Sequence, residues 1–152
     1  MSPYIFIPLQ LRDFKKTRNI IDLKSKRNRA RHWKREMRRG NRRGYVCVEE
    51  GMFIAQGDLV YDSGDPDYTI PGQRIYLSRM VVKHERRGQG IGTAMVHFLC
   101  EEARRQGFSE ISLGVDKINK TAWHIYNKAG FDILLFDGED EHGAYVKLMK
   151  KL

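Results

Sequence analysis

The chain has 152 residues, of which 41% are hydrophobic, and it carries a formal net charge of +9. This length suits one domain with a substantial core, and the composition excludes a disordered chain. Two cysteines without CxxC spacing exclude a disulfide framework, and with five scattered histidines they predict no metal site. No apolar run approaches the roughly 20 residues of a membrane span, so we expect a cytoplasmic protein that contacts no membrane.

Positive charge is concentrated near the start of the chain. Residues 1–48 hold 15 lysines and arginines against 3 acidic residues, whereas residues 49–152 hold 13 against 16. The basic segment 24–43 can hold a polyanion such as RNA through phosphate contacts, or it can form a solvated helix face. The sequence leaves both interpretations open.

The first half of the chain predicts a strand, two helices and three further strands. Pro3, Pro8 and the lack of a basic leader favour a strand at the start over a signal peptide. Ala30, Trp33 and Met37 form a narrow apolar stripe on the second helix, which is otherwise charged. The predicted elements are a strand at 4–9, helices at 13–21 and 24–39, strands at 45–49 and 52–61, an acidic loop at 62–72 and a strand at 73–83.

The second half alternates helices with strands. An apolar stripe predicts a helix that starts at Ile91 and ends at Gly107, and Asn119 is a typical cap for another helix that ends at Gly130. Strands are predicted at 110–115, 131–136 and 144–149, with an acidic loop at 137–143. The resulting order of elements indicates one α/β or α+β domain over residues 1–152, built around a mixed sheet.

A glycine-rich stretch, RRGQGIGT at residues 86–93, lies between a predicted strand and a predicted helix. Glycines let the backbone approach an anion, and a helix N-terminus offers unpaired amides, so the stretch is typical of a phosphate site. No lysine follows the glycines, which excludes a P-loop. The GxGxG spacing differs from the dinucleotide fingerprint GxGxxG, although Asp116 lies where a ribose-binding acid is expected. Only about 60 residues follow, too few for two nucleotide-binding halves.

The same stretch resembles motif A of the GNAT superfamily of N-acetyltransferases, whose consensus is (Q/R)xxGx(G/A) after an apolar strand end. Arg87, Gly90 and Gly92 occupy the defining positions, after the apolar Met80, Val81 and Val82. A second family pattern follows in register, formed by Asn119, Ala122, Tyr126, Gly130 and Phe131. The resemblance covers about residues 75–131.

The resemblance implies a mixed, mostly antiparallel sheet of about seven strands with flanking helices. It also implies a binding site for acetyl-CoA between splayed strands at 77–82 and 111–115. The pantetheine arm would pair with backbone groups near Met80 and Val82 and would contact Asn119. Tyr126 stands at the family's usual general-acid position and is also expected to contact the cofactor, as are Met80, Val81 and Val82. The pyrophosphate would be bound by Arg86, Arg87, Gly88, Gln89, Gly90, Ile91, Gly92 and Thr93.

The general base is where this chain departs from the family. A glutamate often stands at the position of Ser78 or of Gly114, and neither is a carboxylate here. Asp116, on the same predicted strand face as Gly114, is a candidate base. A water chain without a dedicated base is an equal alternative.

The resemblance predicts acetyl transfer from acetyl-CoA to a primary amine of a protein, peptide or small cationic molecule, by a monomer or homodimer. Two acidic stretches, at 62–67 and 137–141, can attract a cationic acceptor or can be solvated loops. The alternative function is a non-catalytic or weakly catalytic CoA-fold module that binds RNA or the ribosome through the basic helix within residues 24–43. Turnover with an amine panel separates the two functions.

Overall fold

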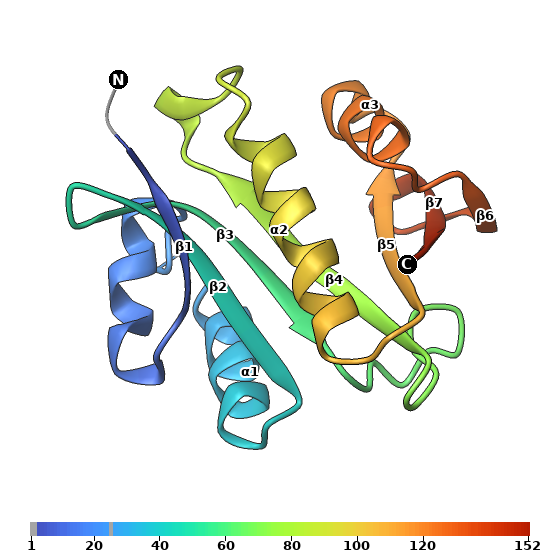
Figure 1. Cartoon of the computed structure of the whole chain (residues 1–152), viewed down its shortest axis with the longest axis horizontal. Helices are drawn as coiled ribbons and strands as arrows, with labels where there is room; N and C mark the ends of the chain where they lie inside the picture. Colours follow the sequence, from blue (N-terminus) through green and yellow to red (C-terminus); the bar gives the residue numbers. More distant parts are fainter. Residues whose placement is uncertain (1–2, 25) are drawn as a thin grey trace. The chain divides into compact units, whose positions relative to one another are not determined.

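The computed structural model describes residues 3–24 and 26–152, and Figure 1 shows their path. Met1, Ser2 and Ser25, the last inside the predicted basic segment 24–43, lie outside the described residues. Seven strands form a mixed sheet in the order β1-β2-β3-β4-β5-β7-β6. The strands are β1 (Ile5–Pro8), β2 (Arg42–Glu49), β3 (Met52–Val60), β4 (Arg74–Val82), β5 (Glu110–Asp116), β6 (Ile133–Asp140) and β7 (Gly143–Lys151). The helices are α1 (Arg27–Arg38), α2 (Ile91–Arg105) and α3 (Lys120–Lys128), with the 3-10 helices η1 (Leu11–Asn19) and η2 (His84–Arg86).

The predicted fold class is confirmed, because the sheet is mixed and mostly antiparallel and the elements follow the predicted order. The chain divides into two compact units, which we describe separately. The first consists of Met1–Leu59 and Arg79–Phe98, and the second of Val60–Ser78 and Leu99–Leu152. That residues 1–152 act as a single domain stays a prediction. Among the described residues, no helix is long and apolar enough to cross a bilayer.

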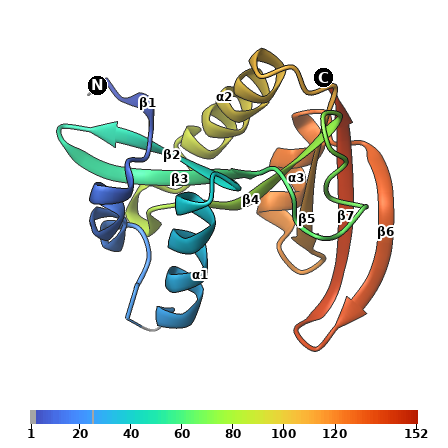
Figure 2. The same cartoon turned by 90° about the horizontal axis from the view of Figure 1, so that it is seen from below.

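The core of the first unit confirms the apolar stripe predicted on α1. Ala30 and Trp33 are buried, and half-buried Met37 packs against the same cluster, which also contains Phe14 of η1. Figure 2 shows η1 and α1 next to each other, below β2 and β3. The arginines of α1 lie on the other helix faces, so burying the stripe leaves them exposed.

The helix predicted over residues 13–21 is a 3-10 helix over Leu11–Asn19. Its two buried residues, Phe14 and Thr17, are three positions apart, which matches three residues per turn. The Thr17 hydroxyl also donates to the Phe14 carbonyl at 2.7 Å. The buried spacing and this hydrogen bond explain the tighter helix.

A buried ionic network links β2, β3 and β4 in the first unit. Asp58, which is 1% exposed, accepts from Arg42 at 2.7 Å and lies 3.6 Å from the Arg79 guanidinium. Arg79 stacks on the Trp33 ring at 3.6 Å, and its backbone is left-handed, with φ 58°. Burial lowers the pKa of Arg79, since its charge is removed from water. Asp58 is therefore an anion that Arg42 and Arg79 share, while Arg42 also pairs with Glu36 at 3.0 Å.

We expect Asp58→Asn to destabilise the chain by about 3 kcal/mol, because it leaves buried cations without their shared anion. Urea unfolding followed by circular dichroism measures this loss. Asp132→Asn, at an exposed aspartate, is the matched control and should change stability by less than about 0.5 kcal/mol. Equal midpoints for the two variants would contradict the role given to Asp58.

The second unit contains a long hairpin formed by β6 and β7, visible in Figure 2. The prediction of an acidic loop at 137–143 is wrong. Asp137 to Asp140 belong to β6 and pair with β7, and the last pair is Asp140 with Gly143. The turn contains only Glu141 and His142. Backbone pairing with β7 continues the strand through an acidic stretch that has low intrinsic strand propensity.

The two cysteines lie in the hydrophobic interior and carry free thiols. Cys47 on β2 and Cys100 on α2 are at most 1% exposed. Burial raises the pKa of Cys47 to about 11, with a smaller contribution from Glu49. Burial also raises the pKa of Cys100. Both side chains therefore stay as neutral thiols at physiological pH.

Candidate functional site

The glycine-rich stretch forms a loop that opens α2 in the first unit. Gly88 and Gly90 have φ values of 76° and 83°, which L-amino acids rarely adopt, and α2 begins directly afterwards at Ile91. A Cβ at either glycine would meet no atom within 4 Å. The first helical hydrogen bond runs from the Ala94 amide to the Gly90 carbonyl. The helix thus offers no carbonyl to the amides before Ala94, and these can bind an anion.

The two arginines of this loop already have partners within the first unit. The Arg86 guanidinium forms a bidentate pair with Glu49 at the end of β2, and its Nε donates to Gln89 at 3.0 Å. The hydrogen bond from Arg86 also lowers the pKa of Glu49. This pair fastens the loop to β2. That Arg86 also contacts a pyrophosphate stays a prediction, and sequence reasoning did not identify Glu49 as its partner.

Arg87 connects the glycine-rich loop to the end of the preceding strand. Its Nε donates a hydrogen bond to the Val82 carbonyl at 3.2 Å. Met80, Val81 and Val82 form the end of β4. β4 and β5 pair in parallel, with Arg74–Tyr76 opposite Glu110–Ser112. Both strands extend beyond these paired residues, β4 to Val82 and β5 to Asp116. Backbone groups of β4 beyond the paired segment are those that the resemblance assigns to the pantetheine arm.

In the second unit, Asn119 caps α3, as predicted. Its side-chain oxygen accepts from the Ala122 amide at 3.1 Å, while its NH₂ group keeps two donors. Tyr126 lies about two turns beyond Asn119 on α3. It is 7% exposed and edge-on to Phe131, with ring centroids 6.0 Å apart. Burial, with a smaller effect of Tyr76, raises the pKa of Tyr126 to about 12. Its phenol therefore stays protonated, as a general acid requires.

The positions considered for a base lie on β4 and β5. Ser78 is buried, and Asp116 is an exposed residue at the end of β5, opposite Tyr145 of β7. Gly114 has a neighbour that sequence reasoning missed: an ideal Cβ built on it would lie 2.4 Å from the Tyr68 hydroxyl. Tyr68 comes from the loop at 62–72, and nothing in its sequence context points to this contact.

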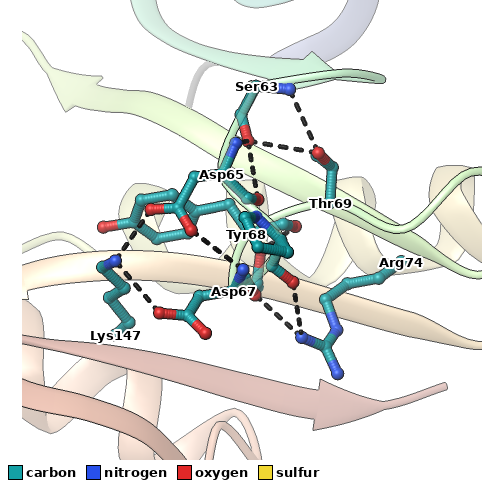
Figure 3. A network of polar contacts seen from close by, with 9 residues as sticks. Ser63, Asp65, Asp67, Tyr68, Thr69, Arg74 and Lys147 are labelled. Atoms are coloured by element: carbon teal, nitrogen blue, oxygen red, sulfur yellow. Dashed lines mark hydrogen bonds and ion pairs between the residues drawn. The ribbon is translucent and has the colours of Figure 1, made fainter.

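The acidic stretches do not present all their charge to solvent. Asp65 and Asp67 bind the Lys147 ammonium at 2.7 and 3.1 Å, as Figure 3 shows. Asp137 pairs with Lys117 at 2.5 Å. Part of the negative charge predicted to attract a cationic acceptor is therefore neutralised within the second unit.

The predicted site residues fall in both units. Asp116, Asn119 and Tyr126 belong to the second unit, whereas residues 80–82 and 86–93 belong to the first. Within each unit the local geometry suits the predicted role: a glycine loop before a helix in one, and a capped helix with a buried, protonated tyrosine in the other.

The sequence profile of the Acetyltransferase (GNAT) family matches residues 8–131. N-acetyltransferase 8B of Homo sapiens is 38% identical over 83 residues, which cover 55% of this chain and 35% of that protein. Thialysine N-epsilon-acetyltransferase of Bos taurus is 40% identical over 62 residues, which cover 41% of this chain and 36% of that protein. The chain thus spans about a third of the length of these two relatives, 35% and 36%.

Among solved structures, an aminoglycoside 6'-N-acetyltransferase complexed with coenzyme A superposes with a TM-score of 0.74 at 16% identity. The superposition covers 97% of this chain and 96% of that one. This likeness extends the shared fold over nearly the whole chain. The comparisons do not support the alternative of a non-catalytic module that binds RNA, since these relatives are all named acetyltransferases.

Proposed function

Because the chain belongs to the acetyltransferase (GNAT) family, we propose that it transfers an acetyl group from acetyl-CoA directly to a primary amine. The observation that carries the proposal is the glycine loop, in which Gly88 and Gly90 adopt left-handed conformations just before α2. Such a loop binds a pyrophosphate through backbone amides and the positive end of the helix dipole.

In the proposed complex, the amides of residues 88–93 bind the pyrophosphate, and Arg87 adds a charge-assisted contact. Arg86 stabilises the loop by its ion pair with Glu49 and lies near the same phosphates. Backbone groups of Met80 and Val82 pair with the pantetheine arm, which also contacts the free NH₂ donors of Asn119. Acetyl-CoA is a co-substrate in this scheme.

The proposed reaction is a single displacement. A neutral amine attacks the thioester carbonyl, the C–S bond breaks, and the leaving thiolate takes a proton from Tyr126. The amine loses one proton, either to Asp116 or to a water chain. The products are an acetylated amine and CoA with a free thiol, and solvent returns the proton to Tyr126.

The proposed acceptor is a primary amine of a protein, a peptide or a small cationic molecule. Two relatives support this class by their names, which specify thialysine and an aminoglycoside as acceptors for those proteins. Exposed carboxylates of the second unit, such as Glu139, favour a cation. A cytoplasmic location is part of the proposal, supported by two unpaired cysteines.

The direct test is incubation with acetyl-CoA and a panel of lysine, thialysine, spermidine, an aminoglycoside and a lysine-containing peptide. We expect at least one amine to gain an acetyl group by mass spectrometry, with an equal amount of CoA released. Binding of CoA without acetylation of any amine, together with RNA binding that weakens steeply with salt, would overturn the proposed function.

A further inference from the structure

The β5 strand lacks a side chain at Gly114, and a tyrosine from another segment fills that space. Ser112, Gly114 and Asp116 lie on one face of β5, because side chains alternate along a strand. A Cβ at Gly114 would lie 2.4 Å from the Tyr68 hydroxyl and 3.4 Å from the ring carbon that bears it. The backbone of Gly114 has no positive φ, so this glycine is needed for space and not for conformation.

Several contacts hold Tyr68 in this position. Figure 3 shows Lys147 between Asp65 and Asp67, which fastens the loop at 62–72 to β7. Although desolvation opposes it, hydrogen bonding to Asp65 and Asp67 raises the pKa of Lys147 overall, so the ammonium stays charged. Lys147 also lies opposite Gly114 in the β5–β7 register, with its ammonium 5.0 Å from the centre of the Tyr68 ring.

The backbone at Tyr68 is fixed as well. The Ser112 hydroxyl donates to the Tyr68 carbonyl at 2.6 Å, and Arg74 donates to the neighbouring Asp67 carbonyl at 2.8 Å. The Tyr68 ring stacks on Tyr76 of β4, with centroids 4.2 Å apart and planes inclined by 21°. Separate contacts therefore hold the loop at 62–72, the Tyr68 ring and the Tyr68 backbone in place.

The Tyr68 hydroxyl differs from the ring and the backbone of this residue, which the contacts above hold in place. The side chain is half-buried, and among the residues that the structure describes none hydrogen-bonds this hydroxyl. Burial and the nearby tyrosines and aspartates raise the pKa of Tyr68, so the phenol stays neutral. Tyr76, on which Tyr68 stacks, also contributes to the raised pKa of Tyr126, after the larger effect of burial.

We propose that Tyr68 binds the acceptor amine: its hydroxyl accepts a hydrogen bond from the amine N–H and orients the nitrogen, at the place where β5 has no side chain. The inference rests on the proposed acetyltransferase function. Tyr68 takes no proton in the reaction, because the phenol stays neutral, so its effect is on binding and orientation. Lys147 is a positioning residue that acts through Tyr68, since its ammonium holds the loop that carries the ring.

The first test is Tyr68→Phe, which keeps the stack on Tyr76 and removes only the hydroxyl. With whichever amine of the panel the wild type acetylates fastest, we expect the acceptor KM to rise about 5- to 10-fold, as for one lost hydrogen bond. The KM for acetyl-CoA and the melting temperature should stay unchanged. Tyr61→Phe is the matched control, because the Tyr61 hydroxyl donates to Gln106 at 2.6 Å; it should affect stability and not the acceptor KM.

The second test is a double-mutant cycle between Tyr68→Phe and Lys147→Met. If Lys147 acts through the Tyr68 hydroxyl, the two changes are non-additive: Lys147→Met raises the acceptor KM in the wild type and little further in Tyr68→Phe. An unchanged acceptor KM in Tyr68→Phe, while the wild type turns over, would overturn this inference and leave the proposed function intact. No turnover by the wild type with any amine would overturn the proposed function itself.

Discussion

Gly90→Glu should weaken CoA binding by about 100-fold or more. The φ of 83° is strained for any L-residue, so the loop leaves the conformation that aims its amides at the pyrophosphate. The new carboxylate also repels the phosphates, and losing even one or two charged hydrogen bonds accounts for this factor. Isothermal titration calorimetry with CoA measures the change.

Gly51→Glu is the matched control for this variant. Gly51, in the turn between β2 and β3, has a φ of 76°, and a Cβ there also meets no atom within 4 Å. Both variants therefore carry similar backbone strain, and each should lower the melting temperature by about 3 °C. CoA affinity should fall only in Gly90→Glu. If that variant keeps wild-type affinity, the pyrophosphate is not bound by this loop.

Tyr126→Phe should lower kcat about 100-fold, which is typical of losing a general acid. The phenylalanine ring preserves the edge-on contact with Phe131, so CoA affinity and the fold should be little changed. Stopped-flow or steady-state release of CoA measures the rate. A variant with wild-type kcat would show that Tyr126 serves packing alone.

The pH dependence gives an independent check on the same residue. The attacking amine must be neutral, so kcat/KM should rise with pH toward the pKa of the amine, about 10 for a lysine side chain. The raised pKa of Tyr126, about 12, keeps its phenol protonated over this whole range. We therefore expect no falling limb between pH 7 and pH 10. A decline that begins near pH 8 in the wild type and is absent from Tyr126→Phe would show that the phenol ionises earlier.

Local patterns were enough to predict most of the fold. The spacing of apolar residues located α2, whose start at Ile91 is confirmed, and the stripe on α1. The cap at Asn119 is confirmed because a capping side chain binds an amide only three residues away. Such interactions depend on neighbours in sequence, and they are therefore visible without a structure.

The errors and omissions involve partners far apart in sequence. Residues 137–140 have a loop-like composition, yet their pairing with β7 makes them a strand. The pairing of Arg86 with Glu49, which sequence reasoning missed, joins residues separated by 37 positions. Tyr68 meets Gly114 across 46 positions, and only the fold brings the two segments together. The identity of the acceptor depends on contacts of this second kind.

The two buried thiols have a practical consequence for assays of this protein. Aromatic disulfide reagents react with thiolates, and Cys47 and Cys100 are both buried and protonated at neutral pH. In the folded protein such a reagent should therefore report released CoA against a negligible protein background. The same reagent added without acetyl-CoA becomes a probe of unfolding, since labelling of the cysteines then requires their segments to open.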